Sequence, residues 1–206
     1  LVAAFLASLT RIQGLFLMLP IAWEAGTAWR ASGLRTGRPL GRIDGRLLLS
    51  AAAAFAPLAA FGVFLMFGIF VVGRSPLDTQ DAWGGRNFHP PWDVVSASWN
   101  WAVDRHDPLQ LLNLATLIGF GLATIAGLRR LPVAYSLIAI PQVALLATRI
   151  QPTPLSSTVR YLMVVFPVFV LLAMIEDKRL QLAWLAGSIM FLTILLLGFE
   201  TGQFIA

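Results

Sequence analysis

The sequence predicts an all-α protein, built as a polytopic bundle of transmembrane helices. Of its 206 residues, 58% are hydrophobic and 12% are charged, whereas a soluble domain carries about 25% charged residues. The apolar residues come in long runs rather than in amphipathic stripes, which is typical of helices that cross a bilayer. The alternation over about ten residues that marks transmembrane β-strands is absent from the sequence.

Charge and cysteine content narrow the possible partners. The formal net charge is +5 and the pI is about 11.0, which in a soluble protein would suggest a nucleic-acid partner. Here the arginines stand at the ends of apolar runs, where they act as topology signals, so we expect no nucleic acid. The chain has no cysteine, which excludes disulfides, thiolate metal sites and cysteine nucleophiles.

The chain starts at Leu1 within an apolar run and without a methionine. We therefore expect residues 1–206 to form a single transmembrane domain that is the C-terminal portion of a longer chain. Residues 1–9 are then the end of an earlier helix. The first complete span is predicted at 12–29, after a short turn, and the glycine- and arginine-rich residues 30–46 are predicted to form a polar loop.

Five further spans are predicted, at residues 47–72, 109–128, 131–148, 161–175 and 180–199. The run 47–72 has 26 residues without a charge, which as a helix measures about 39 Å, enough to cross the hydrocarbon core with tilt. Pro132 suits the first turn of its span, whereas Pro141 and Pro167 lie inside theirs. The charged residues 176–179 are predicted to form a turn before the last span.

Positive charge assigns the loops to the two sides of the membrane. Loops 30–46, 129–130 and 176–179 carry nine Lys and Arg in 23 residues, against six in the longer remainder. This excess predicts that the first set is cytoplasmic. Loops 73–108 and 149–160 then share the outer face.

The outer loop 73–108 holds five of the ten acidic residues, both histidines and four of the seven tryptophans. Within it, apolar and polar residues recur on opposite faces at helical spacing, after Pro91. The apolar set is Trp92, Val95, Trp99 and Val103, and the polar set is Asp93, Ser96, Asn100 and Asp104. This pattern predicts a short amphipathic helix that lies in the membrane interface. It either only anchors the loop or also forms one wall of a substrate groove.

Metal or acid–base chemistry would have its candidates in the same loop. These are Asp78, Asp81, Asp93, Asp104, Asp107, His89 and His106. Their spacing matches no metal motif, and Arg105 supplies a counter-charge within the Asp104–Asp107 run. Asp107 followed by Pro108 also fits an N-cap and first helical residue. We predict no metal site and no cofactor for this chain, although a divalent metal stays open.

Arginines at the outer ends of spans are candidates for binding a lipid phosphate. Arg149 and Arg160, the latter directly before Tyr161, stand at the mouths of adjacent spans, where a guanidinium can pair bidentately with phosphate. Ordinary snorkelling of arginine to the interface explains the same positions. The remaining outer-face candidates, which offer groups that could hold a sugar phosphate, are Arg11, Gln80, Trp83, Arg86 and Asp93.

Three stretches together resemble the PIG-V-like mannosyltransferases. The run Thr10-Arg11-Ile12-Gln13-Gly14, followed by Pro20 and Glu24, is similar to the family's Thr-Arg-x-x-Gly turn and helix. Gln80-x-x-Trp83 followed by Pro91-Trp92 resembles its outer-loop pattern. Arg160-Tyr161 followed by Phe166-Pro167 resembles its Arg-Tyr span.

The resemblance implies a glycosyltransferase of the GT-C superfamily, with a polyprenyl-phosphate-linked sugar as donor and a lipid or glycan as acceptor. Mannose is the family default. Arg160, Arg149 and Tyr161 would contact the donor phosphate, while Gln80, Trp83, Arg86, Asp93 and Arg11 would shape the outer cavity. The catalytic carboxylate would lie in the first outer loop, upstream of Leu1.

Two expectations complete the sequence-based interpretation. The single lysine among 15 basic residues suggests a GC-rich genome, and with it a multi-pass protein of a bacterial plasma membrane. The alternative function is that of a transporter or a non-catalytic membrane scaffold that binds a partner through loop 73–108. A transporter would place ionisable residues within its spans, and here the spans carry almost none.

Overall fold

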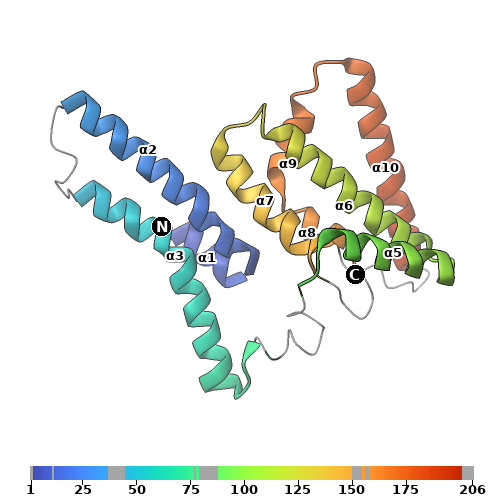
Figure 1. The fold of residues 1–206 in the computed structure, drawn as a ribbon, viewed down its shortest axis with the longest axis horizontal. Coiled ribbons are helices and arrows are strands. Elements are labelled where there is room, and N and C mark those ends of the chain that lie inside the picture. Colours follow the sequence, from blue (N-terminus) through green and yellow to red (C-terminus); the bar gives the residue numbers. More distant parts are fainter. Residues whose placement is uncertain are drawn as a thin grey trace. The chain divides into compact units, whose positions relative to one another are not determined.

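In the part of the chain that it describes, the computed structural model consists of helices joined by turns and has no strand, which confirms the predicted all-α class (Figure 1). It describes residues 2–10, 12–36, 45–76, 78, 88–149, 155 and 158–200. Two compact units divide the chain. The first comprises Leu1–Gly84 and Pro132–Gln142, and the second comprises Gly85–Leu131 and Val143–Ala206.

The first unit is built on the packing of α3 (Gly45–Phe67) against α1 (Val2–Thr10) and α2 (Met18–Thr36). A short 3-10 helix, η1 (Ile12–Leu17), joins α1 to α2 and also contacts α3. Figure 1 shows α2 and α3 side by side. Small buried residues make this approach close, as expected for membrane helices; on α3 they are Ala54, Ala56, Pro57 and Ala60.

The helix α2 departs from the prediction at both ends. It begins at Met18, because the residues before it form the 3-10 helix η1, and it continues to Thr36. The prediction that residues 30–46 form a loop is therefore wrong for residues 30–36, whereas 37–44 lie outside the described residues. Alanine, leucine and arginine in the run 30–36 are good helix formers, so the polar character of this stretch did not end the helix.

At its C-terminal end α3 passes into a π-helical turn, η2 (Gly68–Val72). Gly73 follows with φ of 73°, a left-handed conformation that a glycine adopts without steric cost. The N–H groups of Gly73 and Arg74 both donate to the carbonyl of Gly68. This arrangement satisfies a carbonyl at the end of the helix and turns the chain sharply.

The second unit is organised around α6 (Pro108–Gly127), which packs against α5 (Pro91–Arg105), α8 (Thr158–Leu162) and α9 (Phe166–Ala173). Phe120 of α6 and Phe169 of α9 meet edge to face, with ring centroids 5.8 Å apart and an interplanar angle of 75°. The helix α7 (Val133–Ala147) contributes its first ten residues to the first unit and its last five to the second.

The predicted span 161–175 is broken into the two short helices α8 and α9. The break falls at residues 163–165, immediately before α9, which carries Pro167 in its first turn. Proline has no N–H to donate and restricts the residue before it, so a continuous helix through this point is disfavoured. The last helix, α10 (Lys178–Glu200), begins inside the predicted charged turn, where the side chain of Asp177 accepts from the N–H of Arg179 at 2.8 Å.

Two helices of the described residues are long and apolar enough to cross a membrane. They are Leu48–Val72 and Pro108–Gly127, and they coincide with the predicted spans 47–72 and 109–128. The helix Val133–Ala147 is apolar but shorter. Pro108 opens α6, and the side chain of Asp107 accepts from the N–H groups of Leu109 and Gln110, which confirms the predicted cap.

Candidate functional site

A short backbone contact joins the two loops that were predicted to share the outer face. Phe88 and Arg149 form an isolated antiparallel bridge, and the N–H of His89 donates to the carbonyl of Thr148 at 2.7 Å. Phe88 comes from loop 73–108, and Arg149 begins loop 149–160. The bridge brings Phe88 and Arg149 together and fixes the backbone of Arg149.

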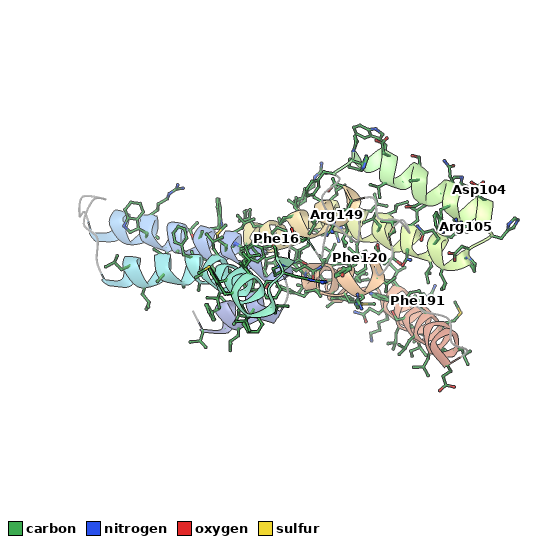
Figure 2. The ribbon with its side chains drawn as sticks, turned by 90° about the horizontal axis from the view of Figure 1, so that it is seen from below. Phe16, Asp104, Arg105, Phe120, Arg149 and Phe191 are labelled. Atoms are coloured by element: carbon green, nitrogen blue, oxygen red, sulfur yellow. The ribbon has the colours of Figure 1, made fainter. Side chains whose placement is uncertain are left out.

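Arg149 stands two residues after the end of α7 (Figure 2). The hydroxyl of Thr148 donates to the carbonyl of Ala144 at 2.8 Å, which closes the last turn of this helix. A cation here is favoured by the negative end of the helix dipole. The side chain of Arg149 is half-buried, and its Nε is buried without a hydrogen-bond partner among the described residues. An unmet donor on a charged group is costly to bury, so this position suits an anionic ligand.

Arg160 and Tyr161 lie together on α8, in a different setting. The exposed guanidinium of Arg160 lies 5.3 Å from the centroid of the Tyr161 ring. The side chains of Thr158 and Leu162 are buried, and α8 packs against α6. The packing of α8 thus leaves Arg160 accessible, while a cation–π contact restrains it.

The remaining outer-cavity candidates are largely outside the described residues. Arg11, Gln80, Trp83 and Arg86 fall there, so their predicted roles stay predictions. Asp93 lies in the first turn of α5, half-buried, with its N–H donating to the carbonyl of Pro90 at 3.0 Å. Its carboxylate stands where the helix dipole favours a negative charge.

The helix α5 presents two different faces. Its buried face consists of Val94, Ser98 and Ala102, small side chains spaced by four residues, and α5 packs against α6. The apolar stripe predicted from the sequence lies on the exposed side of the helix, where Trp92 is 69%, Trp99 is 55% and Val103 is 50% accessible. The predicted helix is present. Its large apolar side chains are exposed, so they can contact lipid or another molecule.

The acidic run at the end of α5 serves local structure. Asp107 caps α6, and the guanidinium of Arg105 lies 3.7 Å from the centroid of the Trp101 ring. Figure 2 shows Asp104 and Arg105 at this end of the helix. His106 closes α5 in a left-handed conformation with φ of 52°. Within the described residues, no three metal-ligating side chains come together, and Asp81 lies outside them.

Comparisons with protein families, with curated proteins and with solved structures find no match for this chain. The resemblance to PIG-V-like mannosyltransferases thus rests on the quoted motifs. The glycine of the first motif, Gly14, has a structural reason in the fold, because a Cβ at this position would lie 2.5 Å from the carbonyl oxygen of Ala7. The turn of this motif therefore packs directly on the backbone of α1.

Sequence reasoning missed two polar side chains that are deeply buried in the first unit. Gln13 of η1 is 4% exposed and Gln142 of α7 is 3% exposed. Each has a buried Oε1 that accepts no hydrogen bond from any described residue. A signal was available for Gln142, because a polar residue within an apolar span is a functional candidate by default. No such signal was available for Gln13, because the sequence predicts a turn at this position and polar side chains are common in turns.

Proposed function

We propose that this chain is the membrane-embedded part of a glycosyltransferase that uses a polyprenyl-phosphate-linked sugar, similar to the PIG-V-like mannosyltransferases. Its role is to bind the phosphate of the donor lipid on the outer face of a bacterial plasma membrane. The observation that carries the proposal is the unpaired, buried Nε of Arg149 at the bridge between the two predicted outer loops.

The membrane assignment is supported by large apolar side chains that no described residue covers. On α3 and its continuation, Phe55, Met66, Phe67 and Phe70 are between 56% and 75% exposed. On α10, Leu182, Leu185 and Met190 are between 58% and 67% exposed. Such surfaces in contact with water would favour aggregation, whereas lipid tails cover them at no cost. We extend this to a polytopic bundle with the six predicted spans.

The chemical role of the arginines follows from charge. When the sugar leaves its lipid carrier, negative charge grows on the phosphate that remains. A fixed guanidinium stabilises that charge more than the ground state and so lowers the barrier. Arg149 has its backbone held by the bridge, while Arg160 is exposed and can follow the lipid. The base that takes the proton of the acceptor is expected in the first outer loop of the family, so no residue of this chain is assigned that role.

The test is sugar transfer by the full-length protein in lipid vesicles, with polyprenyl-phosphate mannose as donor. Arg149→Ala should lower the rate by about 10- to 100-fold, because a charge-assisted hydrogen bond contributes about 1.5–3 kcal/mol. Arg160→Ala should also lower the rate. Arg105→Ala is the matched control, since this exposed arginine already stacks over Trp101, and its rate should not change.

Two results would contradict the proposal in different ways. Normal transfer by both Arg149→Ala and Arg160→Ala would exclude the phosphate-binding role. No transfer by the unaltered protein from any polyprenyl-phosphate sugar would exclude the enzyme and favour the membrane scaffold.

A further inference from the structure

The bridge in the second unit places an aromatic side chain directly beside Arg149. Phe88 and Arg149 stand opposite each other in this antiparallel contact. The hydrogen bond next to them joins the flanking residues, from the N–H of His89 to the carbonyl of Thr148 at 2.7 Å. Phe88 and Arg149 are therefore a non-hydrogen-bonded pair, the type in which opposite side chains lie closest. The two side chains share one face of the bridge, with Cβ atoms about 4.5–5.5 Å apart.

The two side chains of this pair favour different ligand groups. The ring of Phe88 is 66% exposed, and a phenyl ring is stabilised by apolar contact. The side chain of Arg149 is half-buried, and its Nε has no hydrogen-bond partner among the described residues. A guanidinium is stabilised by an oxyanion. A ligand that satisfies both side chains at once is an amphiphile whose anionic group stands next to its apolar part.

The short distance within the pair limits which amphiphile fits. In a prenyl phosphate, the apolar chain begins at the carbon that is bonded to a phosphate oxygen. In a glycerophospholipid, the glycerol and its ester groups stand between the phosphate and the acyl chains. A prenyl phosphate can therefore contact the guanidinium with its phosphate and the neighbouring ring with its first isoprene unit. A glycerophospholipid bound in the same way would place polar ester groups against the ring, which is unfavourable.

Exposure alone does not distinguish Phe88, because single exposed apolar residues are common on protein surfaces. What distinguishes it is the cation on the opposite side of the bridge. The position also suits a ligand that enters from lipid. Trp92, four residues further along the chain, is 69% exposed and begins the apolar stripe of α5, which is predicted to lie in the membrane interface.

We propose that Phe88 and Arg149 together recognise the junction between the phosphate and the first isoprene unit of a prenyl phosphate. Arg149 binds the phosphate, and the ring of Phe88 packs on the isoprene unit. Phe88 is then the residue that distinguishes the donor lipid from the surrounding phospholipids. The inference rests on the proposed function for the class of lipid, and it adds a specificity-determining residue to that function.

The test is ligand binding to the full-length protein in phosphatidylcholine nanodiscs, measured by the concentration-dependent rise of Tm. The probes are farnesyl phosphate and dioctanoyl phosphatidic acid. Both carry a phosphate monoester, but only the first has an isoprene unit bonded to it. The unaltered protein should bind farnesyl phosphate about 10-fold more tightly, because only this ligand brings apolar surface against the ring.

Variants separate the contribution of the ring from that of the charge. Phe88→Ala should weaken farnesyl phosphate binding about 5- to 10-fold and leave phosphatidic acid binding unchanged. Phe88→Leu should restore most of the loss, whereas Arg149→Ala should weaken the binding of both probes. Phe70→Ala is the matched control, because it removes a phenyl ring that is 75% exposed on η2, and it should change neither affinity. Without ligand, Phe88→Ala should unfold at the original Tm, since the bridge is made by backbone atoms.

Several outcomes would overturn the inference. They are equal affinities of the unaltered protein for the two probes, no binding of either probe, and an unchanged affinity of Phe88→Ala or Arg149→Ala for farnesyl phosphate. A loss of affinity in Phe70→Ala as large as that in Phe88→Ala would also overturn it, because the effect would then come from the bilayer. Sugar transfer by a protein whose Phe88→Ala variant keeps its full affinity would exclude this inference alone. Selective binding of farnesyl phosphate without any sugar transfer would exclude only the proposed enzyme.

Discussion

Gly68 lies against the ring of Pro76, so close that a Cβ added to the glycine would be 2.5 Å from Cγ of the proline. The contact closes the turn that follows α3, where the N–H of Arg74 donates to the carbonyl of Gly68 at 3.1 Å. It fixes how the chain leaves α3 and its continuation η2. The relationship depends on the absence of a single methyl group.

Replacing Gly68 by alanine should therefore destabilise the protein by about 1–3 kcal/mol, the usual cost of overpacking. Gly62 lies on the same helix with nothing within 4 Å of an added Cβ. Gly62→Ala should be neutral or stabilising by up to about 1 kcal/mol, because alanine favours the helix. Thermal unfolding of both variants in nanodiscs measures the difference. Equal melting temperatures would show that the ring of Pro76 can move away from an added methyl group without a loss of stability.

Gly14→Ala should cost more than Gly68→Ala. The atoms that an added Cβ would meet are backbone atoms of Ala7 and Ser8, at 2.5 and 2.6 Å. A proline ring can shift at the end of a helix, but the backbone of α1 can move only as a whole. Gly26→Ala, in open space on α2, is the control and should unfold at the original temperature or above it. If Gly14→Ala behaved like Gly26→Ala, the close packing of η1 on α1 would be wrong.

The helical class and the two long apolar helices could be predicted from the sequence, because composition and the length of apolar runs are local properties of the chain. The cap at Asp107 and the proline at the start of α5 were also predictable, because both depend only on neighbouring residues in the sequence. The helical conformation of residues 30–36 was not predictable in this way, because the polar character of this stretch indicates a loop, whereas several of its residues favour a helix. The break before Pro167 was not predicted either, since residues 161–175 were expected to form one span that contains this proline.

The candidate site was less accessible to sequence reasoning. Arg149 could be singled out from its position, but its partner Phe88 could not, because a single backbone bridge leaves no pattern of side chains. Only the fold shows that Gln13 and Gln142 are each buried with an unpaired Oε1. Burial of this kind depends on packing, and no local spacing encodes it.

Asp107→Ala should destabilise α6 by about 1 kcal/mol, the typical loss for an N-cap. Its carboxylate accepts from the N–H of Leu109 at 3.0 Å and from that of Gln110 at 3.3 Å. Asp107→Asn should restore most of the loss. Asp104→Ala is the control, because a negative charge near the end of α5 is not favoured by the helix dipole. Its melting temperature should be unchanged or higher. A loss with Asp104→Ala as large as that with Asp107→Ala would speak against the cap.

The two faces of α5 can be distinguished by lipid contact. Trp99 is 55% exposed on the apolar stripe, whereas Trp101 is half-buried beneath the guanidinium of Arg105. If the stripe lies in the membrane interface, lipids brominated near the headgroup should quench Trp99 strongly. The fluorescence that these lipids quench should then fall in Trp99→Phe and stay nearly constant in Trp101→Phe. Quenching carried mainly by Trp101 would mean that α5 turns its other face to the bilayer. No quenching of either tryptophan would leave the stripe free for a protein partner, as the scaffold alternative requires.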